Sequence, residues 1–236
     1  MARIYHTWHG YAPDSIDPDL LLYLDAANAS SYPGSGSTWI DLTTNNNNAT
    51  LASPTFDVGG FFDFDAASID RATLTDPSVG APSEASLSIW ARWDVFQTNN
   101  KGNGLFFASN TGLTSGFALY QNTIPPYNKL RAFVRSAASI VIGDNLSLLN
   151  TGVWYNIIIS INSSSLAYYL NGVADGSFAT TGPISWSAGA SLGLIGSFRN
   201  IGFFDGQIGY VKVWNKPLNA GEALAEFNLE KTRFGL

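Results

Sequence analysis

From Leu20 onward, short runs of alternating apolar and polar residues follow one another along the chain, and clusters of glycine, proline, asparagine and serine separate them. Alternation with a period of two is typical of a β-strand that has one face on a core. Short strands that recur with turn residues between them are typical of sandwiches. The pattern therefore predicts an all-β fold with about 14 strands.

Two segments carry this pattern most clearly. In residues 86–95, one face consists of Leu87, Ile89, Ala91 and Trp93, and we expect this face in the core. Trp90 lies on the opposite face, so we expect its side chain to point to the second sheet or outward. Residues 166–170 and 173–177 flank Asn171-Gly172. Asn-Gly between two such runs favours a type I′ turn, which predicts a β-hairpin.

One helix is expected, close to the C-terminus. Asn219 is a good N-cap, and Glu222 three positions later completes a capping box. Ala223, Leu224 and Phe227 then supply an apolar stripe.

Length and composition narrow the class of protein further. A chain of 236 residues is expected to form one large domain, which we place at 19–236 after an N-terminal arm at 1–18 that lacks a sustained period. The chain has no cysteine, so disulfides and thiolate metal sites are excluded. A net charge of −6 with scattered basic residues argues against nucleic acid. No segment has the apolar run of a signal peptide or a membrane span, which predicts synthesis in a cytoplasm without membrane insertion.

The carboxylates argue against catalysis. Retaining glycosidases need two carboxylates placed together, but the only glutamates are Glu84, Glu222, Glu226 and Glu230. Asp63 and Asp65 do share a strand face by the period of two. We interpret them as exposed positions on an edge strand, because most acidic side chains lie in water. The sequence therefore predicts that the chain is not an enzyme.

The arm at 1–18 contains both histidines, His6 and His9, and two aromatic residues, Tyr5 and Trp8. No nucleophile motif accompanies the histidines, and a third metal ligand is missing nearby. We therefore interpret Tyr5 and Trp8 as contacts with a neighbouring subunit.

An ordered set of segments resembles the motifs of laminin-G-like, concanavalin-A-like jelly-roll domains, in the form common in bacteriophage structural proteins. The resemblance covers the chain from Leu20 to about Asn228. It is carried by LLLYLD at 20–25, WIDL at 39–42, FFDFD at 61–65, the strand at 85–93, GVWY at 152–155, YYLNG at 168–172 and the stretch from 204 to 222.

This resemblance implies a two-sheet antiparallel jelly-roll sandwich, to which the sequence adds one short C-terminal helix. It implies a non-enzymatic structural or adhesion component of a phage virion, in the head or tail, made in the host cytoplasm. The implied partners are other virion proteins, copies of the same chain, with a trimer expected, and host glycans. The alternative is a free calcium-dependent carbohydrate-binding lectin, and a glycoside hydrolase ranks last.

The resemblance implies that no cofactor is required. It suggests calcium as an optional ligand, with Asp65 and Asp70 as candidate calcium ligands and Asp25 or Asp205 as further candidates. Where many relatives have Phe-Asp-Gly followed by further acidic residues, this chain has Phe64-Asp-Ala-Ala-Ser-Ile-Asp70.

Two aromatic residues lie in expected loops. Tyr127 follows Pro125-Pro126, and Trp186 lies in the segment 183–189. Such rings either stack on a sugar face or fill a subunit interface, and we treat both residues as candidate ligand contacts.

Overall fold

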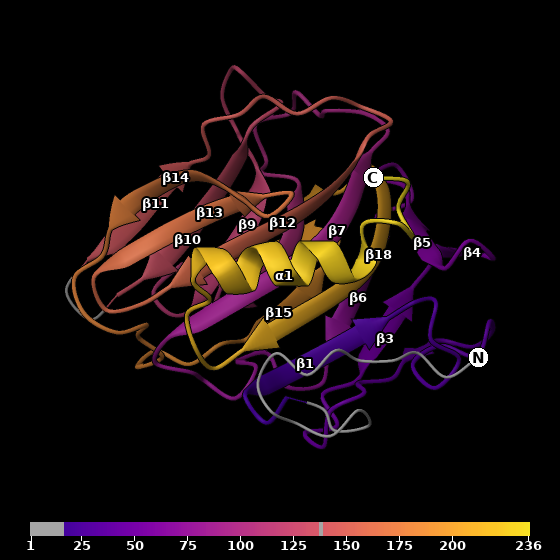
Figure 1. Cartoon of the computed structure of the whole chain (residues 1–236), viewed down its shortest axis with the longest axis horizontal. Helices are drawn as coiled ribbons and strands as arrows, with labels where there is room; N and C mark the ends of the chain where they lie inside the picture. The colour runs from indigo at the N-terminus through magenta and orange to yellow at the C-terminus, as the bar shows by residue number, and fades with distance from the viewer. Residues whose placement is uncertain (1–16, 137–138) are drawn as a thin grey trace.

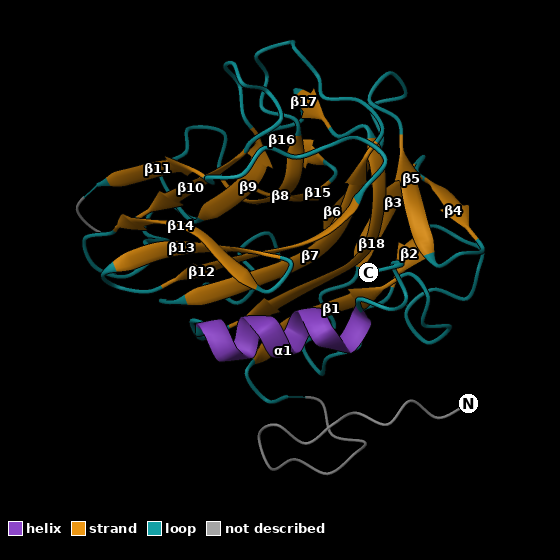
Figure 2. Cartoon of the chain, turned by 45° about the horizontal axis from the view of Figure 1, so that its top comes forward, coloured by secondary structure: helices purple, strands orange, loops and turns teal. Residues whose placement is uncertain are grey.

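The computed structural model describes residues 17–136 and 139–236. The expected subunit contacts Tyr5 and Trp8, and the histidines His6 and His9, lie outside these residues. The described residues form 18 strands and one helix, and removing the four strands of two or three residues leaves 14. The all-β prediction is confirmed: two large antiparallel sheets pack face to face, as Figure 2 shows.

The first sheet has eight strands in the order β14-β13-β12-β7-β18-β5-β4, with β1 paired to β18 in addition. Its strands are β1 (Leu20–Asp25), β4 (Thr55–Asp57), β5 (Phe61–Phe64), β7 (Ala85–Trp93), β12 (Trp154–Ile161), β13 (Ser165–Leu170), β14 (Val173–Ala179) and β18 (Gly206–Trp214). Strand β5 lies one strand in from the edge, because β4 pairs with it. The prediction that Asp63 lies on an edge strand is therefore wrong, although its side chain is exposed.

The second sheet also has eight strands, in the order β11-β10-β9-β8-β15-β6-β3-β2. They are β2 (Thr38–Trp39), β3 (Ala49–Ala52), β6 (Arg71–Leu74), β8 (Gly104–Ser109), β9 (Phe117–Gln121), β10 (Leu130–Arg135), β11 (Ile140–Asp144) and β15 (Leu192–Ile195). A separate two-stranded hairpin is formed by β16 (Ser197–Phe198) and β17 (Gly202–Phe203).

The predicted hairpin and core face are confirmed. Asn171 and Gly172 join β13 to β14, and both have positive φ, 50° and 76°, as a type I′ turn requires. On β7, Leu87, Ile89 and Trp93 lie fully buried in the core between the sheets.

The helix α1 (Ala220–Glu230) lies across the outer face of the first sheet, in front of β18 and β7 in Figure 1. Its capping box is confirmed: the Asn219 side chain accepts from the N–H of Glu222 at 3.1 Å, and Glu222 accepts from the N–H of Asn219 at 2.9 Å. Among the described residues this is the only helix, and it is neither long nor apolar enough to cross a bilayer.

The structure decides between the two expectations for Trp90: its side chain lies on the outer face of the first sheet, outside the core between the sheets, and the C-terminal segment covers it. Its ring is fully buried beneath the C-terminal segment, stacked on Phe234 at 4.2 Å and on Phe227 at 5.8 Å between ring centroids. The apolar stripe expected on α1 is confirmed only in part, because Leu224 is 45% exposed while Glu226, which was not expected on the buried face, is buried. The first sheet thus has apolar layers on both of its faces.

Candidate functional site

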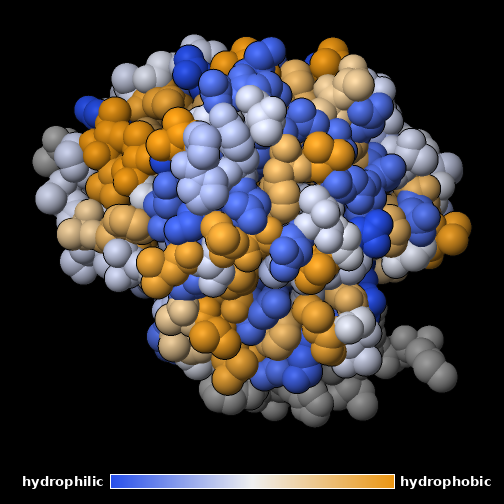
Figure 3. All heavy atoms as spheres, turned by 90° about the horizontal axis from the view of Figure 1, so that it is seen from above, coloured by the Kyte–Doolittle hydropathy of each residue, from blue (hydrophilic) through white to orange (hydrophobic). Residues whose placement is uncertain are grey.

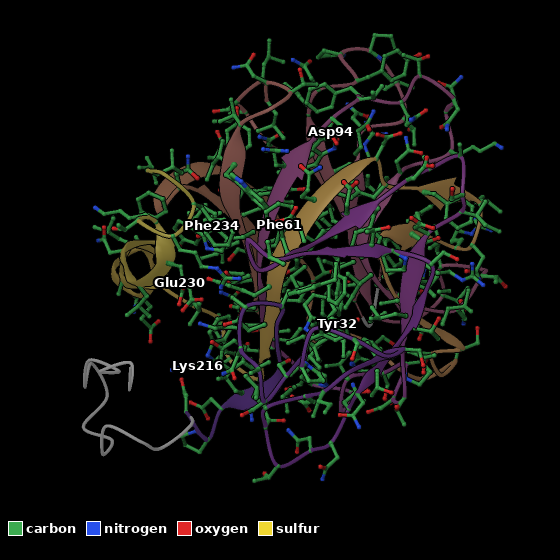
Figure 4. The ribbon with its side chains drawn as sticks, turned by 90° about the vertical axis from the view of Figure 1, so that its right-hand side faces the viewer. Tyr32, Phe61, Asp94, Lys216, Glu230 and Phe234 are labelled. Atoms are coloured by element: carbon green, nitrogen blue, oxygen red, sulfur yellow. The ribbon has the colours of Figure 1, made fainter. Side chains whose placement is uncertain are left out.

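The rim of the sandwich holds an open cleft where β5 and β7 end and β18 begins. Asp94, labelled at the top of Figure 4, directly follows β7 at this rim. The cleft has a volume of about 330 Å³ and is lined by Ala66, Ala67, Ile69, Gln97, Asn99, Lys101, Ile201, Phe203 and Asp205. Figure 3 looks down on this end of the molecule, where hydrophobic residues lie among hydrophilic ones. Three loops distant in sequence therefore supply one mixed surface.

The first wall of the cleft is the turn at 65–70. The Asp65 carboxylate accepts from the Ala67 N–H and from the Ser68 hydroxyl, each at 2.8 Å. These bonds lower the pKa of Asp65, the Ser68 bond most, because both favour the ionised form. The turn ends with Ile69 in the left-handed region, at φ 58°, where its side chain is 53% exposed.

The second wall is the hairpin of β16 and β17. Residues 199–201 connect its strands, Arg199 and Asn200 have positive φ of 59° and 58°, and the Ile201 N–H donates to the Phe198 carbonyl at 3.1 Å. Phe198 anchors the hairpin on the second sheet, 4.3 Å from the Tyr120 ring. The hairpin thereby places Ile201 and Phe203 in the cleft.

This close approach depends on a glycine of β8. A Cβ on Gly104 would lie 2.3 Å from the Ser197 carbonyl carbon and 2.4 Å from the Phe198 nitrogen. Both contacts are with backbone atoms, so a side chain at residue 104 would push the hairpin away from the sheet. The glycine therefore fixes the position of the second wall.

The third wall is polar and comes from the loop after β7. The Gln97 side chain donates to Asp205 at 3.0 Å, and its backbone accepts from Gln121 at 2.6 Å. Asn99 accepts from the Lys101 N–H at 3.0 Å, and both residues have exposed side chains. Amide, ammonium and carboxylate groups therefore converge on one side of the cleft.

Carboxylates in and around the cleft affect one another's pKa values. Burial raises the pKa of Asp205, and the nearby charges of Asp65 and Asp94 raise it further. Burial is also the main reason that the pKa of Asp70 is raised, with the charges of Asp65 and Asp63 adding to it. The Gln207 side chain, which is buried, bridges two of these acids by donating to Asp63 at 2.6 Å and to Asp94 at 2.8 Å.

The structure brings the two calcium candidates together. The Asp65 N–H donates to Asp70 Oδ2 at 2.9 Å, and Asp70 Oδ1 is buried without a hydrogen-bond partner. Both oxygens of Asp65 already accept from its own turn, and the described residues contain no group of three histidine, aspartate or glutamate side chains placed to hold a metal ion. One free carboxylate oxygen is a poor match to the six to eight oxygens of a calcium site.

Tyr127 and Trp186 lie in different places. The Tyr127 hydroxyl donates to the Asn100 side chain at 3.2 Å, next to the polar wall of the cleft. The Trp186 indole donates to the Pro82 carbonyl at 2.8 Å and packs edge-on against Phe117. Trp186 is not among the residues that line the cleft.

All four glutamates make polar contacts within the fold. Glu84 accepts from the Ser163 N–H, Glu222 caps α1, Glu226 accepts from Lys212, and Glu230 lies 3.5 Å from Arg233. None of them lines the cleft.

Sequence reasoning missed Gln97, Asn99, Lys101, Ile201 and Phe203. These residues lie in two loops about 100 positions apart, and only the pairing of the strands between them brings them together. Ile69 carried one usable signal, since a β-branched residue in a turn rich in alanine and serine is unusual.

Comparison with known proteins identifies the family. Residues 65–223 match the laminin-G-type family described as the concanavalin A-like lectin/glucanases superfamily, and the chain belongs to this family. No curated protein matches the sequence.

Solved structures share the fold at low sequence identity. Domain 4 of the extracellular arabinanase AbnA from Geobacillus stearothermophilus, solved with arabinotriose, has a TM-score of 0.65 and 16% identity over 88% of this chain and 97% of that domain. The Trypanosoma rangeli sialidase with sialic acid has a TM-score of 0.63 and 16% identity over 93% of this chain, which spans 34% of the sialidase. The binding domain of botulinum neurotoxin serotype D/C has a TM-score of 0.60 and 14% identity over 89% of this chain and 52% of that domain.

Calcium binding by Asp65 and Asp70 stays a prediction, and thermal unfolding tests it. If Ca²⁺ binds Asp70 Oδ1, calcium at about 100 times its Kd is expected to stabilise the chelator-treated protein by about 2.7 kcal/mol. Asp70→Asn should remove this gain, whereas Asp57→Asn, at the exposed end of β4, should keep it. Equal melting temperatures with calcium and with chelator would rule the site out.

Proposed function

We propose that this chain is a non-catalytic carbohydrate-binding module that a phage virion displays as a head or tail accessory protein. The observation that carries the binding function is the rim cleft. One side of it offers apolar side chains, including Phe203, and the other offers Gln97, Asn99, Lys101 and Asp205. A sugar ring has this same division between apolar C–H faces and polar hydroxyls, so it matches both sides.

Similar structures support carbohydrate as the ligand class. The arabinanase domain was solved with arabinotriose, the sialidase with sialic acid, and botulinum neurotoxin type C depends on two ganglioside molecules for cell entry. Fold alone does not transfer a ligand, so the proposal rests on the cleft first and on these neighbours second. The virion role rests on the ordered set of segments from Leu20 to about Asn228 that resembles phage structural proteins.

The non-catalytic part of the proposal is supported by the positions of the glutamates. Each makes a structural contact, and Glu226, the most deeply buried of the four, is paired with Lys212 at 2.7 Å. A glycosidase needs a carboxyl pair facing the bound sugar. The carboxylate that lines the cleft is Asp205.

A glycan array tests the binding function. The intact protein is expected to bind a defined set of glycans, and Phe203→Ala and Asn99→Ala are each expected to weaken binding about tenfold, or about 1.4 kcal/mol. Asn150→Ala is the matched control, because Asn150 is exposed and does not line the cleft. Silence with and without calcium would refute carbohydrate binding. Binding that requires calcium would favour the alternative of a free lectin.

Assembly is tested separately. We propose that the chain forms a symmetric homo-oligomer, a trimer, through the arm at 1–18, since closed symmetric assemblies are the common form of soluble oligomers. Sedimentation velocity should give a discrete oligomer for the full chain and a monomer after residues 1–17 are deleted. A monomer at high concentration for both chains would contradict the proposal.

A further inference from the structure

Ile69 combines two features that the fold itself does not need. Its backbone has φ 58°, in the left-handed region, where a β-branched residue is an outlier and glycine or asparagine is favoured. Its side chain is 53% exposed, so the core gains little from it. Strain of this kind clusters at sites where the side chain is needed for binding.

Ile69 has a counterpart across the cleft. Ile201, 49% exposed, lines the same cleft from the β16–β17 hairpin, and Phe203 lies two residues further on. The turn at 65–70 and the hairpin are held independently, the first by Asp65 and the second by Phe198. Two loops, each held by contacts of its own, therefore present exposed aliphatic side chains to one space of about 330 Å³.

The aliphatic side chains limit which sugar fits. A plain hexose carries a hydroxyl at almost every ring position, and a hydroxyl that is buried against isoleucine loses its water without gaining a partner. Burying a methyl group in the same place is favourable, because it removes apolar surface from water. The remaining hydroxyls can then meet Gln97, Asn99 and Asp205 on the polar wall.

We propose that the cleft selects a sugar that carries a methyl group, as an acetamido or a 6-deoxy substituent, with Ile69 and Ile201 as the residues that contact the methyl group. This inference rests on the proposed carbohydrate-binding function and names the class of sugar that the same cleft takes. The cleft volume, near the lower end of the range of about 300–1,000 Å³ for ligand sites, suits one or two sugar units.

Matched sugar pairs test this selection by titration calorimetry. N-acetylglucosamine tetramers are compared with glucose tetramers of the same linkage, and L-rhamnose, which is 6-deoxy-L-mannose, with L-mannose. In at least one pair the methyl-bearing sugar is expected to bind about tenfold more tightly, the range that a methyl-sized group gives in an apolar pocket. Equal binding within both pairs would overturn the inference.

Ile69→Asn separates recognition from folding. Asparagine tolerates the left-handed backbone, so the variant is expected to melt at the same or a higher temperature. The ratio of its affinities for the methyl-bearing sugar and for the matched sugar without the methyl group is expected to fall to about one. Ile69→Gly is a second variant with the same expectation, and Val58→Asn, at a 97% exposed position, is the control that should keep the preference. A preference that survives both Ile69 variants would contradict the role of Ile69. Binding of no carbohydrate at all would instead refute the proposed function itself, which the glycan array reports separately.

Discussion

Glu226→Ala is expected to lower the free energy of unfolding by about 3–5 kcal/mol, as measured by urea denaturation. Glu226 is 6% exposed and accepts from the Lys212 ammonium at 2.7 Å and from the Tyr210 hydroxyl at 2.6 Å. Its removal leaves the ammonium buried among the rings of Tyr23 and Tyr210 without a carboxylate partner. The loss is therefore dominated by an uncompensated buried charge.

The double variant Lys212→Met/Glu226→Met is the control for this prediction. Because it removes both charges together, it should recover most of the stability lost in Glu226→Ala. A double variant as unstable as the single one would mean that packing of α1, and not the charge, carries the effect.

Phe234→Ala is also expected to lower the free energy of unfolding by about 3–5 kcal/mol, because the substitution leaves a cavity where a buried ring packs. Its ring stacks on Trp90 at 4.2 Å and contacts Trp154 at 4.6 Å, and it lies beside Phe61 and α1 in Figure 4. The next residue toward the N-terminus, Arg233, pairs with the buried Asp25 at 2.8 Å. The C-terminal turn is thus part of the fold.

Leu236→Ala is the matched control, since Leu236 is 46% exposed two residues further on. Its free energy of unfolding should change by no more than about 0.5 kcal/mol, as for most exposed substitutions. If Phe234→Ala unfolds at the same urea concentration as Leu236→Ala, the C-terminal segment does not cover the sheet as described.

These contacts bear on function, because α1 and the C-terminal turn occupy the outer face of β7 and β18. A ligand cannot lie on that part of the first sheet without displacing them. The rim cleft lies at the ends of the same strands and remains accessible.

Local patterns in the sequence predicted much of this fold. The period of two placed Ile89 in the core, Asn171-Gly172 gave the hairpin turn, and Asn219 with Glu222 gave the helix start. The burial of Trp90 was not predictable in this way, because the helix that covers it comes 130 residues later and its contact residues include two buried glutamates. The period of two left open whether this face meets the second sheet or points outward, and only the tertiary packing of α1 and Phe234 buries it.

The site was predicted only in part for the same reason. Asp65 and Asp70 belong to one turn, so their proximity follows from the local sequence. The cleft beside them needs the antiparallel pairing of β18 with both β5 and β7, which brings Phe203 and Asp205 next to Ala66 and Gln97. No short-range pattern encodes that pairing.

A crystal structure of the protein with the glycan that binds most tightly on the array would show where the sugar binds. The sugar is expected in the rim cleft, with its ring or methyl group against Phe203 and Ile69 and its hydroxyls on Gln97, Asn99 or Asp205. A sugar bound elsewhere, for example on the outer face of the second sheet over β9 and β10, would show that the rim cleft is not the binding site.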